Sequence, residues 1–364
     1  MSQTVIPWGD PKAVKKWSAN LAVDMLDKSY FNTKFIGKGT NNIIEEKKDL
    51  ESDPGDRVSF DLSVQLRKAP TTGDKRVKGN GENLKFFTDE IIIDQARHEV
   101  SAGGRMTRKR TAHDLRQVAR DRLGDYWSKW QDELFFIYLS GARGINEDFI
   151  EDTAYAGHAT NPLRAPDSQH LLYGGDATSK ASLVAADVMT RNVIERAVTR
   201  ARMMRAKDPA TANMVPVKIG SEEHYVTVMS HYQEHDMRNA AGSEWLDIQK
   251  AAASAEGKKN KIFTGGLGMI NNVVLHSHSS AIRFDDYGAG SDVEAARALF
   301  MGRQAGVYAC GMKNGRFDWS EEMEDRGNEP VVTAGTIIGV SKTRFNNRDF
   351  GVMAIDTAAT EPTG

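Results

Sequence analysis

The chain has 364 residues, of which 40% are hydrophobic and 27% charged, values typical of a soluble globular protein with two or three packing units. Its 48 basic and 50 acidic side chains give a net charge of −2, which argues against a dedicated nucleic-acid binder and against a surface for anionic lipid. Cys310 is the only cysteine, so an internal disulfide and a thiolate zinc cluster are excluded and a reducing cytoplasm is expected. We expect no secretory signal and no membrane-spanning segment, because no stretch has the apolar length that either needs.

The N-terminal residues 1–55 are polar and rich in turn formers, apart from one amphipathic stretch at 17–35. Trp17, Leu21 and Met25 recur there at helical spacing, and Gly37 and Gly39 follow the stretch. We therefore predict a terminal helix. The pattern fits both a helix that packs on its own subunit and an arm that reaches a neighbour.

A long β-hairpin is predicted between residues 58 and 100. Apolar and polar residues alternate from 58 to 66, which is typical of a strand with one buried face. A second β-rich run covers 84–100, and the intervening 67–83 is dominated by Lys, Arg, Gly, Asn and Pro. The unpaired edges of such a hairpin would promote aggregation in a monomer, whereas in an assembly they would provide a means of attachment. The hairpin by itself leaves both alternatives open.

Two amphipathic helices are predicted next, at 106–140 and at 182–206, with irregular structure at 145–181 between them. At about 1.5 Å per residue the first would be a rod of about 45 Å that ends at Gly141 and Gly144. Its polar side is expected to carry ion pairs from Lys129 to Asp125 and Glu133. Its apolar stripe steps by three or four residues and comprises Leu115, Ala119, Leu123, Tyr126, Trp130, Leu134 and Ile137.

Strands and helices mix in the rest of the chain, which places the protein in the α+β class. Predicted strands cover 215–219, 270–276 and 299–309, and predicted helices cover 224–238 and 245–255. A second hairpin is expected near the C-terminus. Its strands cover 331–345 and 350–355, and a polar turn at 346–348 joins them.

The strongest catalytic motif is the segment HYQEH at 231–235, which fits the H-x-x-E-H pattern of zinc hydrolases. On a helix, His231 and His235 would hold the metal and Glu234 would act as the general base. The motif usually needs an acidic third ligand on a following helix, and nothing in the sequence singles out Glu294 or any other acid for that place. A zinc-dependent hydrolase that uses His231, Glu234 and His235 is therefore the alternative function.

The other candidate sites have ordinary structural explanations. His276 and His278 are expected at the end of a surface strand, and the acidic pairs at 285–286 and 321–322 in solvated turns. The glycines at 265–268 lack the spacing of a phosphate loop, and the basic runs at 105–110 and 258–261 are expected on solvated faces. The sequence therefore assigns no catalytic, cofactor-binding or metal-binding residue.

Several blocks of sequence, in the same order along the chain, resemble the phage N-four-like family of major capsid proteins of tailed bacteriophages, which have the HK97-like fold. The block GDRVSFDLSVQL leads into the predicted hairpin, and IIDQARH returns from it. The blocks lie at 55–66, 92–98, 222–226 (EEHYV), 245–251 (WLDIQKA), 296–305 (ARALFMGRQA), 342–345 (KTRF) and 349–352 (DFGV). Because they span nearly the whole chain, they are more specific than any single motif.

The resemblance implies an HK97-like α+β fold with an N-terminal arm at 1–55 and an extended β-hairpin loop at 56–104. A peripheral domain with the spine helix would comprise 105–206 together with 331–364, and an axial domain would comprise 207–330. The resemblance also implies a non-enzymatic subunit that assembles into hexamers and pentamers of an icosahedral phage head around double-stranded DNA. Its place would be the virion, with assembly in the cytoplasm of the host bacterium.

The partners that the resemblance implies are further copies of the chain and the phage DNA, enclosed without sequence-specific binding. A separate scaffold, a portal and decoration proteins are further partners of this kind of subunit, and the short arm makes a fused scaffold unexpected. Some relatives form lysine–asparagine cross-links, and the hairpin holds Lys75, Lys78 and Asn80. A nanocompartment that encloses cargo would be another use of the same fold.

Overall fold

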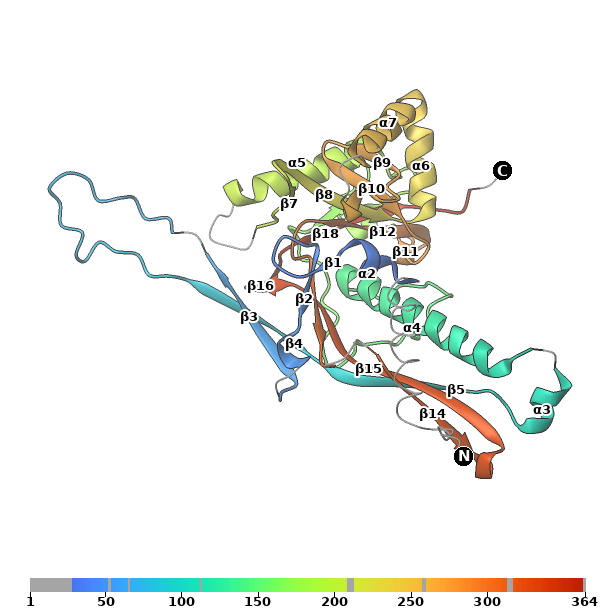
Figure 1. Ribbon diagram of the computed structural model, residues 1–364. Helices are drawn as coiled ribbons and strands as arrows, with labels where there is room; N and C mark the ends of the chain where they lie inside the picture. The colour runs from blue at the N-terminus through green and yellow to red at the C-terminus, as the bar shows by residue number, and fades with distance from the viewer. Residues whose placement is uncertain are drawn as a thin grey trace.

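The long helix α4 (Leu115–Ser140) lies between two β-sheets and organises the molecule (Figure 1). A computed structural model describes residues 28–51, 54–64, 66–111, 113–207, 213–256, 260–312 and 317–362. One sheet continues along α4 toward one end of the elongated molecule, and a two-stranded hairpin projects from the opposite end (Figure 1). No helix of the described residues has the length and apolar character needed to cross a membrane.

The first sheet, six-stranded within the described residues, is built around the 14-residue strand β15 (Glu329–Lys342). One edge of β15 pairs with β5 (Asp94–Ser101). Its other edge pairs first with β14 (Asp318–Glu324) and then with β13 (Gly306–Cys310). The remaining strands, β2 (Ile44–Lys47) and β1 (Ile36–Gly37), extend the sheet beyond β13.

The second sheet, eight-stranded within the described residues, has the buried strand β12 (Val293–Met301) at its centre. Leu299 and Met301 of β12 face α4, whereas Ala298 and Phe300 face the helices of the opposite layer, so the strand reads as a nearly continuous apolar run. The other strands are β6 (Leu171–Tyr173), β7 (Val217–Ile219), β8 (Glu222–Met229), β9 (Gly268–Ile270), β10 (Val273–Ser277), β11 (Arg283–Tyr287) and β18 (Val352–Ala358).

Three helices cover the face of the second sheet that points away from α4 (Figure 1). They are α5 (Arg191–Lys207), α6 (His231–Ala241) and α7 (Trp245–Glu256). The predicted helix at 245–255 is thereby confirmed. The second sheet is thus covered by α4 on one face and by these three helices on the other, so that only its edges reach solvent.

The start of the described chain is fastened to α4 through the short helix α2 (Tyr30–Lys34). Asp132 of α4 is buried and accepts hydrogen bonds from Ser29 Oγ at 2.8 Å, Tyr30 N at 2.8 Å and Phe31 N at 3.0 Å. Burial raises the pKa of Asp132 to about 6. Most of the predicted helix at 17–35 lies outside the described residues, and α2 is the part of it that the structure describes.

The predicted helix at 106–140 is instead two helices, α3 (Arg105–Arg110) and α4. Thr111 has an extended backbone, and Asp114 caps α4 by accepting hydrogen bonds from the N–H groups of Arg116 and Gln117. The continuous rod therefore has 26 residues, or about 39 Å at about 1.5 Å each. Gly141 ends it with φ of 70°, as expected.

The predicted ion pairs on α4 do not form. Lys129 pairs instead with Asp148 of the loop after the helix, at 3.7 Å. Glu133 is buried and accepts the N–H groups of Ile150 and Glu151, both at 2.8 Å. Contacts with the loop at 148–151 therefore replace the pairs expected along the helix.

The helix predicted at 182–206 begins nine residues later, as α5. Asp187 prevents an earlier start because its side chain accepts the N–H of Val184 at 2.9 Å, forming a local turn. Val188 then forms an isolated bridge with Ala358 of the second sheet. The apolar spacing in 182–190, which predicted a helix, is therefore that of a buried turn.

The helix predicted at 224–238 is wrong in its first half, where the chain forms β8. This strand lies between β10 and β12 and is buried from residue 224 on, so its apolar run resembles the buried face of a helix. The helix α6 begins only after Ser230, whose side chain accepts the N–H of Gln233 while Gln233 Oε1 accepts the N–H of Ser230.

The strand predicted at 299–309 is divided between the two sheets, because β12 ends at 301 and β13 begins at 306. Gln304, with φ of 52°, turns the chain between them. The predicted strand at 270–276 is similarly split into β9 and β10 by a tight turn in which Asn271 and Asn272 have positive φ. The predicted strand at 215–219 is confirmed as the shorter β7.

The predicted C-terminal hairpin is formed only at its turn. The strands β16 (Arg344–Phe345) and β17 (Arg348–Asp349) pair across a turn in which Asn346 and Asn347 have positive φ. The longer strands that flank them, β15 and β18, belong to different sheets. This short hairpin is therefore the point where the chain passes from the first sheet to the second.

The two sheets do not follow the expected domain boundaries. The strands β13 and β14 fall within the expected axial segment 207–330, yet they join the first sheet. The strands β6 and β18 and the helix α5 fall in the expected peripheral segments, yet they belong to the second sheet and its helix layer. One source of the difference is that β15 and β18 are separated in sequence only by the short hairpin of β16 and β17 but lie in separate sheets.

Candidate interaction surface

The projecting hairpin consists of β3 (Arg57–Ser63) and β4 (Phe86–Ile92), paired from Arg57↔Ile92 to Ser63↔Phe86. The alternation predicted for 58–66 is confirmed over β3, where Val58 is buried and Phe60 and Leu62 are half-buried between exposed polar residues. The run predicted at 84–100 is two strands, since β4 stays in the hairpin and β5 continues into the first sheet.

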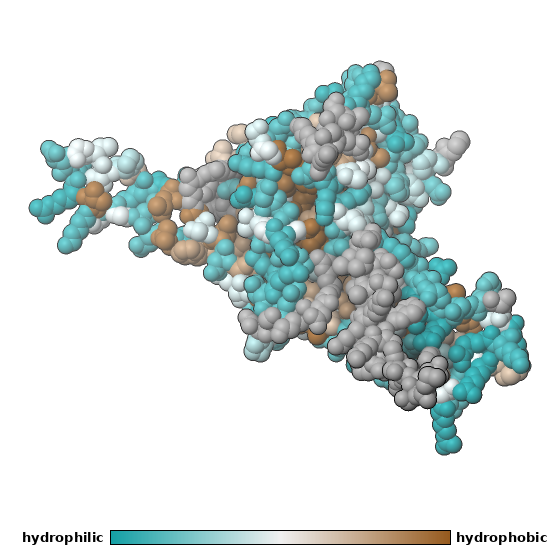
Figure 2. Space-filling view, viewed as in Figure 1, coloured by the Kyte–Doolittle hydropathy of each residue, from teal (hydrophilic) through white to brown (hydrophobic). Residues whose placement is uncertain are grey.

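Apolar contacts anchor the base of the hairpin. Val58 and Ile91 are buried against Val307 and Ala309 of β13. Farther out, the ring of Phe60 meets the ring of Phe345 edge-on, with 6.0 Å between the centroids. Figure 2 shows hydrophobic side chains along the stem of the arm and mainly hydrophilic ones at its end.

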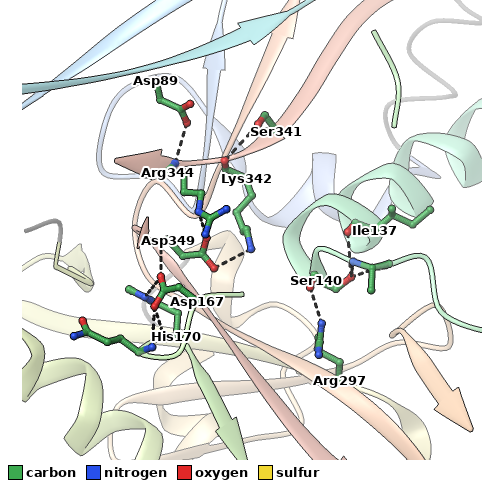
Figure 3. A network of polar contacts seen from close by, with 12 residues as sticks. Asp89, Ile137, Ser140, Asp167, His170, Arg297, Ser341, Lys342, Arg344 and Asp349 are labelled. Carbon is green, nitrogen blue, oxygen red and sulfur yellow. Dashed lines mark hydrogen bonds and ion pairs between the residues drawn. The ribbon is translucent and has the colours of Figure 1, made fainter. Parts of the chain in front are cut away.

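Polar contacts fix the base as well. Asp89 of β4 is buried, and its carboxylate accepts a hydrogen bond from Arg164 Nη1 at 3.0 Å. It also accepts the backbone N–H of Arg344 at 2.9 Å (Figure 3). The side-chain amide of Asn161 accepts the N–H of Ile92 at 3.0 Å and donates to the Ile92 carbonyl at 2.7 Å. It thus makes the two hydrogen bonds that the backbone of a paired strand would make at this position. The hairpin thus leaves the body at a defined position.

A buried ionic network joins this base to the crossing between the sheets (Figure 3). Asp349 is 1% exposed and accepts a hydrogen bond from Lys342 Nζ at 2.8 Å, with Arg344 Nε at 3.3 Å from its second oxygen. Its own N–H donates to Asp167, which is also 2.9 Å from His170 Nδ1. Burial raises the pKa of Asp167, but the hydrogen bond and charge of His170 outweigh it and hold that pKa well below its usual value.

A second buried pair ties the end of α4 to the second sheet. Asp356 of β18 accepts hydrogen bonds from Arg297 Nε and Nη2, both at 2.7 Å, and from the Tyr287 hydroxyl at 2.7 Å. Arg297 Nη1 donates to the carbonyl of Ser140 at 2.9 Å (Figure 3). The two networks make the two sheets, α4 and the hairpin base one connected body.

Apart from Lys85, whose carbonyl accepts the N–H of Val64 at 3.0 Å, the residues at the end of the hairpin, 66–85, form hydrogen bonds only within that segment among the described residues. Glu82 accepts the N–H groups of Arg67 and Lys68, both at 2.7 Å, and these bonds lower the pKa of Glu82. Leu66, Val77 and Leu84 are 55%, 70% and 63% exposed. The segment carries six basic and two acidic side chains. Exposed apolar groups on a basic arm are typical of a surface that another protein covers.

The zinc-binding hypothesis finds no support in the geometry. His231 and His235 lie on α6 with their side chains 59% and 47% exposed. Glu234 pairs with Arg238 at 2.5 Å, and its other oxygen lies 3.4 Å from His231 Nδ1. Among the described residues, no group of three or more His, Cys, Asp or Glu side chains could hold a metal ion. The motif is thus the exposed face and one ion pair of a structural helix.

The remaining candidates lie in structural positions. His276 was expected at the surface but is buried, and its Nε2 is 2.9 Å from the Ile262 carbonyl. The acidic pairs lie on β11 and β14, in strands where turns were expected, and Glu321 turns inward to Arg120 at 3.2 Å. Cys310 is buried, and the basic run at 105–110 forms the largely exposed α3. Residues 258 and 259 lie outside the described residues.

A phage capsid protein family matches residues 5–361 of the chain. The chain belongs to this family. The major capsid protein of Pseudomonas phage KPP25 is 24% identical over 370 residues, which are 94% of each protein. This subunit is thus a phage major capsid protein, and the resemblance seen in the sequence is confirmed.

Solved structures agree with this membership. The capsid of Ralstonia phage GP4 is 64% identical to the chain, with a TM-score of 0.89 over 100% of both chains. The capsid of cyanophage Pam1 is 19% identical, with a TM-score of 0.69 over 92% of this chain and 93% of that one. The HK97-like α+β fold is confirmed, and the major capsid protein is a structural subunit of the phage shell and of the virion.

Proposed function

We propose that this major capsid protein forms hexamers and pentamers of an icosahedral head that encloses double-stranded DNA, and that it has no enzymatic activity. The projecting hairpin carries the proposal, because its end is exposed, basic and partly apolar and is held away from its own body. In a ring of subunits such an arm meets a different surface of the next copy. Assembly would take place in the cytoplasm of the host, and scaffold, portal and decoration proteins would be the further partners.

The arrangement of the sheets supports a revised division of the subunit. We assign the first sheet with α4 to the peripheral domain and the second sheet with α5, α6 and α7 to the axial domain. The residues before 56 remain the N-terminal arm, although β1 and β2 are built into the first sheet. The axial domain is then the part expected around the centre of each hexamer or pentamer.

Replacement of residues 67–83 by an Asn-Gly turn tests the role of the hairpin. The deleted segment contacts only the hairpin itself among the described residues, so the thermal unfolding temperature should change by no more than about 2 °C. Closed particles or rings seen by electron microscopy for the full chain should be lost in the deletion. A deletion that still assembles would refute the role of the hairpin, and a full chain that stays monomeric at high concentration would refute the shell subunit itself.

A further inference from the structure

Asn80 and Gly81 are adjacent in the exposed end of the hairpin, away from the body of the subunit (Figure 1). The amide carbon of an asparagine side chain is an electrophile, and the backbone nitrogen of the next residue can reach it by closing a five-membered ring. A side chain on that next residue hinders the attack, and glycine has none. A second Asn-Gly pair, at 314–315, lies outside the described residues.

The structure leaves the nucleophile of this pair open. Gly81 is exposed, and a Cβ added there would have no heavy atom within 4 Å apart from its chain neighbours. Among the residues that the structure describes, none accepts a hydrogen bond from the Gly81 N–H. Hydroxide can therefore reach this N–H, and no packing opposes the change of backbone angles that ring closure requires.

The electrophile is held by one exposed contact. The N–H of Asn80 donates to the Val77 carbonyl at 2.9 Å across a turn in which Gly79 has φ of 88°. The side chain of Asn80 donates from Nδ2 to the Arg76 carbonyl at 3.0 Å. A single exposed hydrogen bond of this kind favours the bonded rotamer by a factor of only about five, so the side chain is often free to turn toward Gly81.

A cation lies beside the pair. Lys68 Nζ donates to the Gly81 carbonyl at 3.3 Å, which places a positive charge within one residue of the attacking nitrogen. The reaction passes through negatively charged species, first the deprotonated nitrogen of Gly81 and then an oxyanion on Asn80 Cγ. A nearby cation stabilises both, so Lys68 is expected to accelerate ring closure.

We propose that Asn80 deamidates spontaneously in the folded subunit. The Gly81 nitrogen, after losing its proton to hydroxide, forms a bond to Asn80 Cγ. The bond from Cγ to the side-chain nitrogen breaks, so that ammonia leaves and a succinimide ring remains. Water then opens the ring: cleavage between the ring nitrogen and Cγ gives aspartate, and cleavage between the ring nitrogen and the backbone carbonyl carbon gives isoaspartate. The reaction needs only water and hydroxide.

Either product changes the end of the hairpin. The new carboxylate lowers the excess of basic over acidic side chains at 66–85 from four to three. A carboxylate also cannot donate to the Arg76 carbonyl, so the turn loses the hydrogen bond that Nδ2 makes. Subunits therefore become a mixture with age at the end of the arm to which the proposed function gives a role in assembly.

Incubation of purified full-length subunits, kept too dilute to assemble, tests the inference. Cleavage by trypsin after Lys78 and Lys85 gives the peptide 79–85, which mass spectrometry and an isoaspartate assay then examine. This peptide also holds the matched control Asn83, which is exposed like Asn80 but precedes Leu84. Asn80 should deamidate at least about tenfold faster than Asn83, and its rate should rise up to about tenfold between pH 7 and pH 8.

Two variants separate the chemistry from the sequence context. Gly81→Ala should slow the reaction of Asn80 by about tenfold or more, because a methyl group hinders the attack. Lys68→Gln should slow it by about two- to fivefold at equal pH, because only the nearby charge is removed. A synthetic peptide of residues 74–86 should react within about fivefold of the folded subunit, since one hydrogen bond is all that restrains the side chain.

The results that would overturn the inference are equally specific. An Asn80 rate no faster than that of Asn83, or equal in the unmodified chain and in Gly81→Ala, would exclude ring closure at this pair. A folded subunit that reacts far more slowly than the peptide would show that the hairpin end is closed to the reaction. An equal rate in Lys68→Gln would overturn the role of Lys68. Because unassembled subunits are measured, none of these results depends on the proposed function.

Discussion

Substitution of Asp356 by alanine should destabilise the subunit strongly, because it leaves the guanidinium of Arg297 buried without its counter-ion. The carboxylate of Asp356 is about 1% exposed and accepts two hydrogen bonds from Arg297 and one from Tyr287. After the substitution, the Ser140 carbonyl and the Tyr287 hydroxyl are the acceptors that remain for this cation among the described residues. Removal of one partner of such a buried pair typically costs about 3–5 kcal/mol.

The expected change in unfolding temperature follows from the length of the chain. An unfolding entropy of about 2.1 cal/mol/K per residue gives about 0.8 kcal/mol/K for this chain, so a loss of about 4 kcal/mol lowers the unfolding temperature by about 5 °C. Differential scanning calorimetry of unassembled subunits measures it. A double variant, Arg297→Met with Asp356→Ala, also removes the unpaired charge and should recover about half of the loss.

The exposed ion pair between Arg191 and Glu244 is the matched control. Its atoms are 2.9 Å apart, close to the distances in the buried pair, but the side chains are 50% and 62% exposed. Glu244→Ala should therefore shift the unfolding temperature by less than about 1 °C. Equal shifts for Asp356→Ala and Glu244→Ala would refute the reasoning from burial.

Two further predictions concern the backbone and pH. Gly141 and Gly79 both have positive φ, of 70° and 88°, but an added Cβ would overlap backbone only at Gly141, where it meets the Arg164 carbonyl. Gly141→Ala should therefore cost about 2 kcal/mol more than Gly79→Ala, whose Cβ would have nothing within 4 Å; similar urea midpoints would contradict this. Burial lowers the pKa of His278 from 6.5 to about 4, so the unfolded chain binds more protons between these values, and stability should rise by at most about 3 kcal/mol as pH increases from 4 to 6.5. His278→Phe keeps a ring against Phe136 and should flatten this dependence in urea unfolding at pH 4.5 and 7, whereas an unchanged slope would show that other groups cause it.

The sequence contained enough information for the hairpin, the spine helix and the family, because each depends on local patterns. Alternation from 58 to 63 depends on the period of a strand alone, and the glycine that ends α4 depends on one backbone conformation. The break at Thr111 and Asp114 was missed because it depends on a single cap within a helical pattern.

The pairing of strands could not be predicted from local patterns. The run at 299–309 reads as one buried strand, and only Gln304 with positive φ divides it between two sheets. The segment before α6 reads as part of a helix, because a strand buried on both faces has no alternation to reveal it. The grouping of β5, β14 and β15 could not be foreseen either, since these strands are brought together only by long-range pairing.

The passage from β4 to β5 has a mechanical consequence. The two strands are separated only by Ile93 and follow nearly one line from the hairpin into the first sheet (Figure 1). A pull on the hairpin along this line loads the eight paired positions between β5 and β15 in shear, so that their hydrogen bonds resist together and do not open one by one. Tension from a neighbouring subunit would therefore pass straight into β15, the longest strand of the described chain, and be spread along the sheet.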